Sequence, residues 1–179
     1  MRHDKKNLIF RVLLFLFVLI LSIILFLNRG LVQKVAHLGY GGIFLINIIS
    51  NATLILPLPG VVFTSTMGAV FNPFLVALAA GIGAGLGEVT GYLAGFSGQI
   101  IVEHSKMYET LTEWMKRYGS LTILVMAIIP TPFFDLAGIA AGILKLSLSR
   151  FLFWCVLGKI IKMLFFAYTG ETILNFLFN

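Results

Sequence analysis

The sequence has few charged residues, one cysteine and three histidines, and each shortage excludes a class of protein. Only 11% of the 179 residues are charged, against about a quarter in a typical soluble domain. A single cysteine excludes an internal disulfide framework, and the cysteine and histidines lack the spacing of a metal site. There is no Gly-x-Ser-x-Gly turn for a nucleophilic serine and no glycine-rich phosphate loop. We therefore expect no enzyme activity, no cofactor and no metal.

The residues that are abundant are apolar. Hydrophobic residues make up 59% of the chain, and 17 of them are phenylalanine. A soluble domain of this size cannot bury so much apolar surface, so lipid must cover part of it. The net charge is +6, but the basic residues lie mostly between apolar runs, as in loops that meet anionic headgroups, which excludes a nucleic-acid-binding face. The composition predicts an all-α integral membrane protein whose partners are membrane lipids; self-association is left open.

Residues 1–38 predict an anchor helix followed by a short polar loop. Basic residues precede an apolar run from Leu8 to Leu27, and no pair of small residues marks a cleavage site after it. The run is long enough to span a bilayer. Lysine and arginine are more frequent before this helix than after it, so we place the N-terminus in the cytoplasm.

Two later apolar segments, 39–71 and 121–144, are interrupted by Pro-x-Pro. Pro57 and Pro59 break the first, and Pro130 and Pro132 break the second. Proline removes a backbone donor and clashes with the preceding helical turn. Broken backbone at membrane depth is tolerated only where protein or a water-filled cavity covers it. We therefore predict two re-entrant helical hairpins.

The rest of the chain completes two similar halves of a membrane domain over 39–179. Each hairpin precedes an apolar helix, at 73–98 and 149–170, and an amphipathic linker at 100–118 separates the halves. In that linker Met107, Leu111, Trp114 and Tyr118 recur at helical spacing, which indicates a helix at a membrane surface. One intervening span would place the hairpins on opposite membrane faces. This pattern predicts an inverted repeat with its working site near the midplane.

The helix at 73–98 carries a stripe of glycines that predicts close helix packing. Gly87, Gly91 and Gly95 recur every four residues, a spacing that allows a neighbouring helix to approach closely in lipid.

Several charged residues lie where lipid would surround them. Glu88 lies near the middle of one apolar helix, with Tyr92 one turn away, and Lys159 and Lys162 share a face of the last helix. Each charge costs about 3 kcal/mol at the bilayer centre. Two interpretations remain open: an ion pair of Glu88 with one lysine that only joins two helices, or a path for a headgroup, proton or ion.

Asp135 has two interpretations as well. It follows Pro132 and precedes an apolar run, so its carboxylate could cap the returning half-helix of the second hairpin. It could also be a proton or cation site at the tip of that hairpin. The two roles are compatible.

These residues resemble the DedA/VTT superfamily, also called SNARE-associated Golgi proteins, and especially its small YqaA-like bacterial members. The resemblance covers residues 50 to 170. It rests on Gly-Glu-x-x-Gly-Tyr-x-x-Gly at 87–95, Arg-Tyr-Gly at 117–119, Ile-Pro-x-Pro at 129–132 and Ser-Arg-Phe at 149–151. It implies a bacterial or archaeal plasma membrane and two opposed re-entrant hairpins. It also implies movement of phospholipid or polyprenyl-phosphate lipid without ATP.

The chain departs from the bacterial pattern at both hairpins. Val61 and Val62 follow Gly60 where an acidic residue is expected, and Ile128, Phe133 and Phe134 stand where arginines are expected. The resemblance therefore carries over only Glu88 and Arg150 as candidates. Lipid transport or scrambling is the leading hypothesis. Proton-coupled ion or drug antiport through Glu88 and Asp135 is one alternative, and a non-transporting assembly protein is another. The substrate or proton pathway candidates are Glu88, Tyr92, Asp135, Arg150, Lys159 and Lys162.

Overall fold

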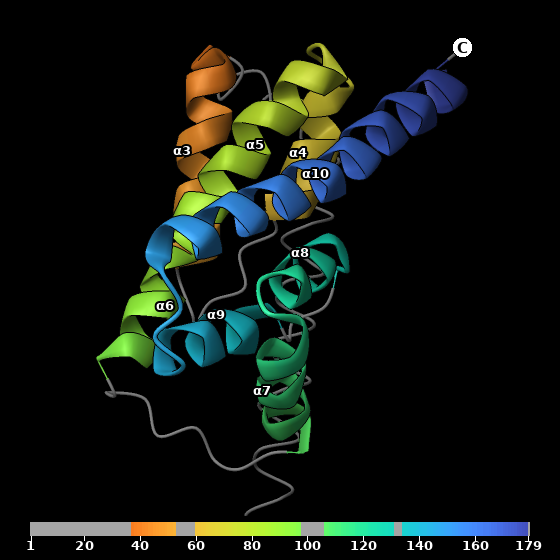
Figure 1. The fold of residues 1–179 in the computed structure, drawn as a ribbon. Helices are drawn as coiled ribbons and strands as arrows, with labels where there is room; N and C mark the ends of the chain where they lie inside the picture. The colour runs from red at the N-terminus through yellow and green to blue at the C-terminus, as the bar shows by residue number, and fades with distance from the viewer. Residues whose placement is uncertain (1–36, 53–59, 98–105, 131–133, 179) are drawn as a thin grey trace, which may run out of the picture.

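The computed structural model describes residues 37–52, 60–97, 106–130 and 134–178, and its regular structure in these ranges is entirely helical (Figure 1). The all-α class predicted from composition is therefore confirmed for this part of the chain. The predicted anchor helix lies outside the described residues, as do Pro57, Pro59 and Pro132.

The first helix pair consists of α3 (Gly39–Ala52) and α4 (Gly60–Gly68). The rings of Tyr40 and Phe71 lie 5.5 Å apart, so the start of α3 and the residues after α4 are at the same end of the molecule. At 1.5 Å per residue the helices are about 21 and 14 Å long, shorter than the roughly 30 Å of a hydrocarbon core. Neither helix is long enough to cross a bilayer alone.

A longer helix follows as α5 (Pro73–Gly87) and α6 (Val89–Phe96). Asn72 caps it, since its side chain accepts from the amides of Phe74 and Leu75 at 3.1 and 3.2 Å, and Pro73 occupies the first turn. Hydrogen bonds continue through the break at Glu88, from its amide to Ala84 and from Tyr92 to its carbonyl. Together α5 and α6 form an apolar helix of 24 residues that is long enough to span a membrane.

The second half contains α7 (Lys106–Tyr118), the second helix pair α8 (Leu121–Ile128) and α9 (Phe134–Ile143), and α10 (Leu148–Phe178). A tight turn ends α9, in which Lys145 adopts φ +53° and its amide bonds to the carbonyl of Gly142. The last helix continues beyond the predicted end at residue 170. Residues 148–173 are the second segment long and apolar enough to span a membrane.

Glycines on two faces of α5 let it pack between α3 and α10. A Cβ added at Gly83 or Gly87 would overlap carbonyl oxygens of α3, whereas one at Gly81 or Gly85 would overlap residues of α10. In Figure 1, α3 lies beside α5 and α10 crosses in front of it. Small side chains on both faces are needed because each neighbour approaches to backbone distance.

The same kind of glycine contact joins each helix pair to the long helix of the other half. In α4 and α10, Gly68 meets the Ala167 carbonyl and Gly170 meets the Ser65 carbonyl. In α9 and α6, Gly142 meets the Tyr92 carbonyl and Gly95 meets the Ile139 carbonyl. Each half therefore completes its packing with a helix from the other.

The buried apolar residues form two clusters, one toward each end of the long helices. The upper cluster in Figure 1 joins α3, α4, α5 and the later part of α10. The lower cluster joins α6 to α9 and the early part of α10. The long helices pass from one cluster to the other. Their buried charged residues, Glu88, Lys159 and Lys162, lie where the two clusters meet.

Candidate functional site

The polar junction, defined here as Asn51, Glu88, Lys159 and Lys162, lies between the two apolar clusters. Along the first long helix, Ala84 belongs to the upper cluster and Tyr92 to the lower one, and Glu88 lies one turn from each. Along α10, Cys155 and Met163 belong to different clusters, with Lys159 one turn from each. The junction is therefore a buried polar layer between two apolar layers.

Glu88 and Lys159 form an ion pair that joins the break between α5 and α6 to the middle of α10. The two side chains are only 2% and 3% exposed, so water does not screen them. A second acceptor satisfies the ammonium, because Lys159 Nζ donates to Asn51 Oδ1 at 2.9 Å. A buried charge is tolerated when it is both paired and hydrogen-bonded. The pairing considered from the sequence thus forms with Lys159.

Asn51 extends the hydrogen bonding from the ion pair into the first helix pair. Its Nδ2 donates to the Asn47 carbonyl at 2.9 Å. Asn47 Nδ2 donates to the Ile43 carbonyl at 2.9 Å and to Thr64 Oγ1 at 3.4 Å, and Thr64 donates to the Gly60 carbonyl at 2.8 Å. The sequence alone did not identify Asn51 as a partner of Lys159.

Both helix pairs reach the polar junction. The first reaches it at the end of α3, where a Cβ added at Gly87 would come 2.9 Å from the Ala52 amide nitrogen. The second reaches it from the other side, since a Cβ at Gly158 would come 3.4 Å from the Ile128 amide nitrogen and one at Gly138 would come 3.8 Å from the Glu88 carbonyl. Three helices of the two pairs, α3, α8 and α9, thus approach the long helices beside the charged pair.

Lys162 shares the buried face of α10 with Lys159 but not its partners. Its exposed fraction is 9%. Among the described residues, no carboxylate forms an ion pair with it. The two lysines are three residues apart on one helix, where like charges repel.

Tyr92 has a positioning role that the sequence left unspecified. Its hydroxyl donates to the Leu146 carbonyl at 2.5 Å, which ties α6 to the turn between α9 and α10. Its ring stacks on Phe151 at 5.1 Å and on Phe96 at 6.0 Å. Tyr92 is buried in the lower apolar cluster, so it supports the junction without belonging to it.

The remaining predicted pathway residues are not part of the polar junction that the structure describes. Arg150 is exposed in the first turn of α10. The backbone of Asp135 is the second residue of α9, which begins at Phe134, so this residue lies within the first turn and does not precede the helix. Its side chain lies outside the described residues, so the predicted N-cap and the predicted proton or cation site both stay predictions. Pro130 is exposed just after α8.

The predicted glycine stripe contacts two different helices. All three of its glycines are buried. Gly87 faces α3, whereas Gly95 faces α9. The four-residue spacing places these glycines near one face of the helix formed by α5 and α6. That face packs on α3 at Gly87 and on α9 at Gly95.

The apolar residues of α7 also divide between two environments. Leu111 and Met115 are buried in the lower cluster, whereas Trp114 and Tyr118 are 47% and 55% exposed. The guanidinium of Arg117 lies 5.2 Å from the centre of the Tyr118 ring. An exposed aromatic pair beside basic residues is typical of the membrane–water interface.

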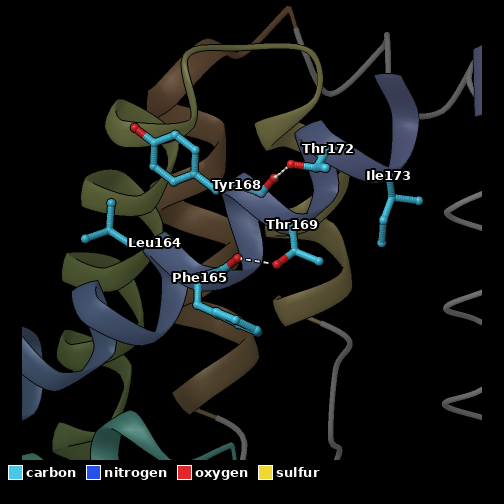
Figure 2. Close-up of a pocket in the computed structure, with 6 residues that line it drawn as sticks. All are labelled: Leu164, Phe165, Tyr168, Thr169, Thr172 and Ile173. Atoms are coloured by element: carbon cyan, nitrogen blue, oxygen red, sulfur yellow. Dashed lines mark hydrogen bonds between the residues drawn. The ribbon is translucent and has the colours of Figure 1, made fainter. Parts of the chain in front are cut away.

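A shallow groove lies further along α10 than the charged pair and is chemically different. It is lined by Leu164, Phe165, Tyr168, Thr169, Thr172 and Ile173 (Figure 2). The two threonine hydroxyls donate to carbonyls of their own helix, Thr169 to Phe165 and Thr172 to Tyr168. The groove is therefore an apolar surface with no free polar group from these threonines. Separately, no group of three or more His, Cys, Asp or Glu in the described ranges is placed to hold a metal.

Comparison with known proteins identifies the family. The sequence model of the VTT domain matches residues 58–172. The chain belongs to the DedA/VTT family of membrane proteins. The inner membrane protein YqaA of Escherichia coli (strain K12) is 30% identical over 118 residues, which are 63% of this chain and 78% of that protein. The inner membrane protein YqaA of Shigella flexneri gives the same values. No solved structure matches.

Proposed function

We propose that this chain moves a phospholipid or polyprenyl-phosphate lipid across the bilayer without ATP, with the headgroup passing the polar junction. The observation that carries the proposal is a buried layer of hydrogen-bonded charges between two apolar layers, reached by two helix pairs. Such a layer is costly in a membrane protein and is typical of substrate pathways. A headgroup that crosses the hydrocarbon needs polar partners near the midplane.

The packing supports an inverted repeat of two re-entrant hairpins. The four helices of the pairs are too short to cross a membrane, whereas the two long helices are long enough. In the first half, α4 packs through glycines on α10 of the second half. In the second half, α9 packs in the same way on α6 of the first half. In inverted-repeat transporters, broken helices from both halves meet around a site near the midplane.

The membrane that fits this proposal is a bacterial or archaeal plasma membrane. The relative in Escherichia coli is described as an inner membrane protein. The excess of lysine and arginine before the predicted anchor helix supports a cytoplasmic N-terminus.

The proposal is tested by reconstituting the purified full chain into vesicles that contain a trace of headgroup-labelled fluorescent phospholipid. Dithionite added outside bleaches only the outer leaflet unless lipid exchanges between leaflets. We expect the protected inner-leaflet signal to decay in protein-containing vesicles and to persist in protein-free ones. Persistence in both would contradict transport of phospholipid, and the same assay with a fluorescent polyprenyl phosphate tests the other substrate.

Glu88→Gln separates this proposal from proton-coupled antiport. This substitution keeps the shape of the side chain but removes its charge and its ability to carry a proton. If a proton gradient drives transport of an ion or drug, and this dependence is lost in Glu88→Gln while lipid exchange is absent, the antiporter hypothesis replaces ours. Lipid exchange that needs no gradient supports our proposal.

A further inference from the structure

Lys162 is the charge in the polar junction that no described carboxylate pairs with. Lys159 has Glu88 and Asn51 as acceptors. Lys162, three residues further along the buried face of α10, pairs with no carboxylate in the ranges that the structure describes. The described side chains of the junction thus carry two lysines and one glutamate.

The surroundings of Lys162 make burial of its charge unfavourable in the absence of a ligand. A buried ammonium without a counterion loses hydration that nothing replaces. The neighbouring Lys159 adds repulsion, because residues three apart on a helix share a face. Glu88 is held by the other lysine, so it cannot neutralise both charges at close range.

The ammonium of Lys162 is not fully enclosed by the described residues. In the described part of the chain, the fully enclosed polar side-chain atoms that lack a partner are Asn47 Oδ1 and Thr122 Oγ1. The Lys162 nitrogen is not among them, and 9% of the residue is exposed. An anion entering the junction can therefore contact Lys162 without first breaking the ion pair of Glu88.

We infer that Lys162 binds an anionic oxygen group, of the phosphate class, beside the Glu88–Lys159 pair. A lysine ammonium is a strong partner for phosphate as a point charge with three donors. The bound anion would supply the missing counterion and relieve the repulsion between the two lysines. The inference deepens the proposed function and rests on it for the role of the anion as a lipid headgroup. Free phosphate would offer the same chemistry.

The binding test is independent of transport. The melting temperature of the detergent-solubilised full chain is measured alone, with added phosphatidylglycerol, with phosphatidylcholine and with inorganic phosphate. We expect phosphatidylglycerol to raise the melting temperature of the wild type more than phosphatidylcholine does. Lys162→Met should lose this difference and Lys162→Arg should keep it. A rise with inorganic phosphate that Lys162→Met also loses would identify a free anion as a second source of the ligand.

The same variants distinguish a binding lysine from a structural one. Without ligand, Lys162→Met should melt at a higher temperature than the wild type, because an uncompensated buried charge is replaced by an apolar side chain of similar length. A structural lysine would give the opposite sign. Lys116→Met, which removes an exposed charge on α7, serves as the matched control and should change neither property.

Two outcomes overturn the inference. One is equal stabilisation of the wild type and Lys162→Met by phosphatidylglycerol. The other is no anion-dependent stabilisation of the wild type by lipid or phosphate. In vesicles, we expect Lys162→Met to slow exchange of labelled phosphatidylglycerol about tenfold relative to phosphatidylcholine, as for the loss of one charge-assisted contact. If no lipid exchanges in any vesicle but Lys162-dependent binding persists, the transport proposal fails and the anion site stands.

Discussion

The two helix pairs occupy corresponding places in the fold but contribute different chemistry to the polar junction. The first pair supplies side-chain amides and a hydroxyl, since Asn47, Asn51 and Thr64 form a hydrogen-bonded chain that ends at Lys159. The second pair supplies close backbone packing, since Gly138 and Ile128 approach the long helices beside the charges. The first helix pair thus presents a polar face to the junction, and the second pair presents an apolar one. The difference shows that similar packing in the two halves does not require similar chemistry.

The largest effect should come from breaking the Glu88–Lys159 ion pair, to which the first helix pair contributes Asn51. Lys159→Met leaves Glu88 buried without its lysine, and losing one partner of a buried pair costs about 3–5 kcal/mol. We expect little purified protein, or a large fall in melting temperature by fluorescence-detected size exclusion. The double variant Glu88→Gln and Lys159→Met should recover most of this loss, because neither charge is then uncompensated.

If the double variant were as unstable as Lys159→Met alone, the loss would come from packing and not from charge. Lys116→Met is the control for removal of a lysine at an exposed helical position.

An intermediate effect should come from separating a helix pair from the opposite long helix. A Cβ in Gly142→Ala would overlap the Tyr92 carbonyl of α6, and one in Gly68→Ala would overlap the Ala167 carbonyl of α10. Backbone cannot move as a flexible side chain does, so each substitution should destabilise the protein by about 1–3 kcal/mol. The melting temperature of each variant measures this effect.

Gly41→Ala is the matched control, because nothing lies within 4 Å of a Cβ added to that glycine on α3. Equal melting temperatures for Gly142→Ala and Gly41→Ala would show that α9 and α6 are not in close contact.

The smallest effect tests the contrast between the polar first helix pair and the apolar second pair. Thr64→Val in the first pair removes a hydroxyl that accepts from Asn47 and donates to Gly60, so it should cost about 1 kcal/mol. Thr122→Val in the second pair removes an enclosed hydroxyl that has no partner among the described residues, so it should be neutral or stabilising. Melting temperatures of the two variants test the difference in sign, and a similar loss in both would contradict the contrast.

The sequence predicted the helices and the unusual charges because both have local signals. A proline in the middle of an apolar run interrupts a helix, and a glutamate or lysine within such a run is conspicuous. Partners across the fold have no such signal. Helical spacing placed Lys159 and Lys162 on one face, but only the packing of α3 and α5 against α10 decides that Asn51 and Glu88 bind Lys159.

The same limit explains how the glycines and α7 differ from expectation. Spacing shows which residues share a face, and it does not show which helix that face meets. The glycine stripe therefore contacts α3 at Gly87 and α9 at Gly95. In α7, Met115 is buried while its neighbour Trp114 is exposed, although tryptophan belongs to the predicted apolar stripe. The membrane can receive the exposed aromatic residues, so a wide apolar face is shared between protein and lipid.

Lipid exchange by the double variant Glu88→Gln and Lys159→Met tests most directly whether the polar junction acts in transport. The variant is compared with the wild type in the dithionite assay, at equal protein content and after its melting temperature is known. A stable variant that has lost most of its lipid exchange is the result we predict, because the charged pair at the centre of the polar junction is gone while the packing remains. A stable variant that exchanges lipid at the wild-type rate would show that the ion pair only joins two helices, and would contradict the account.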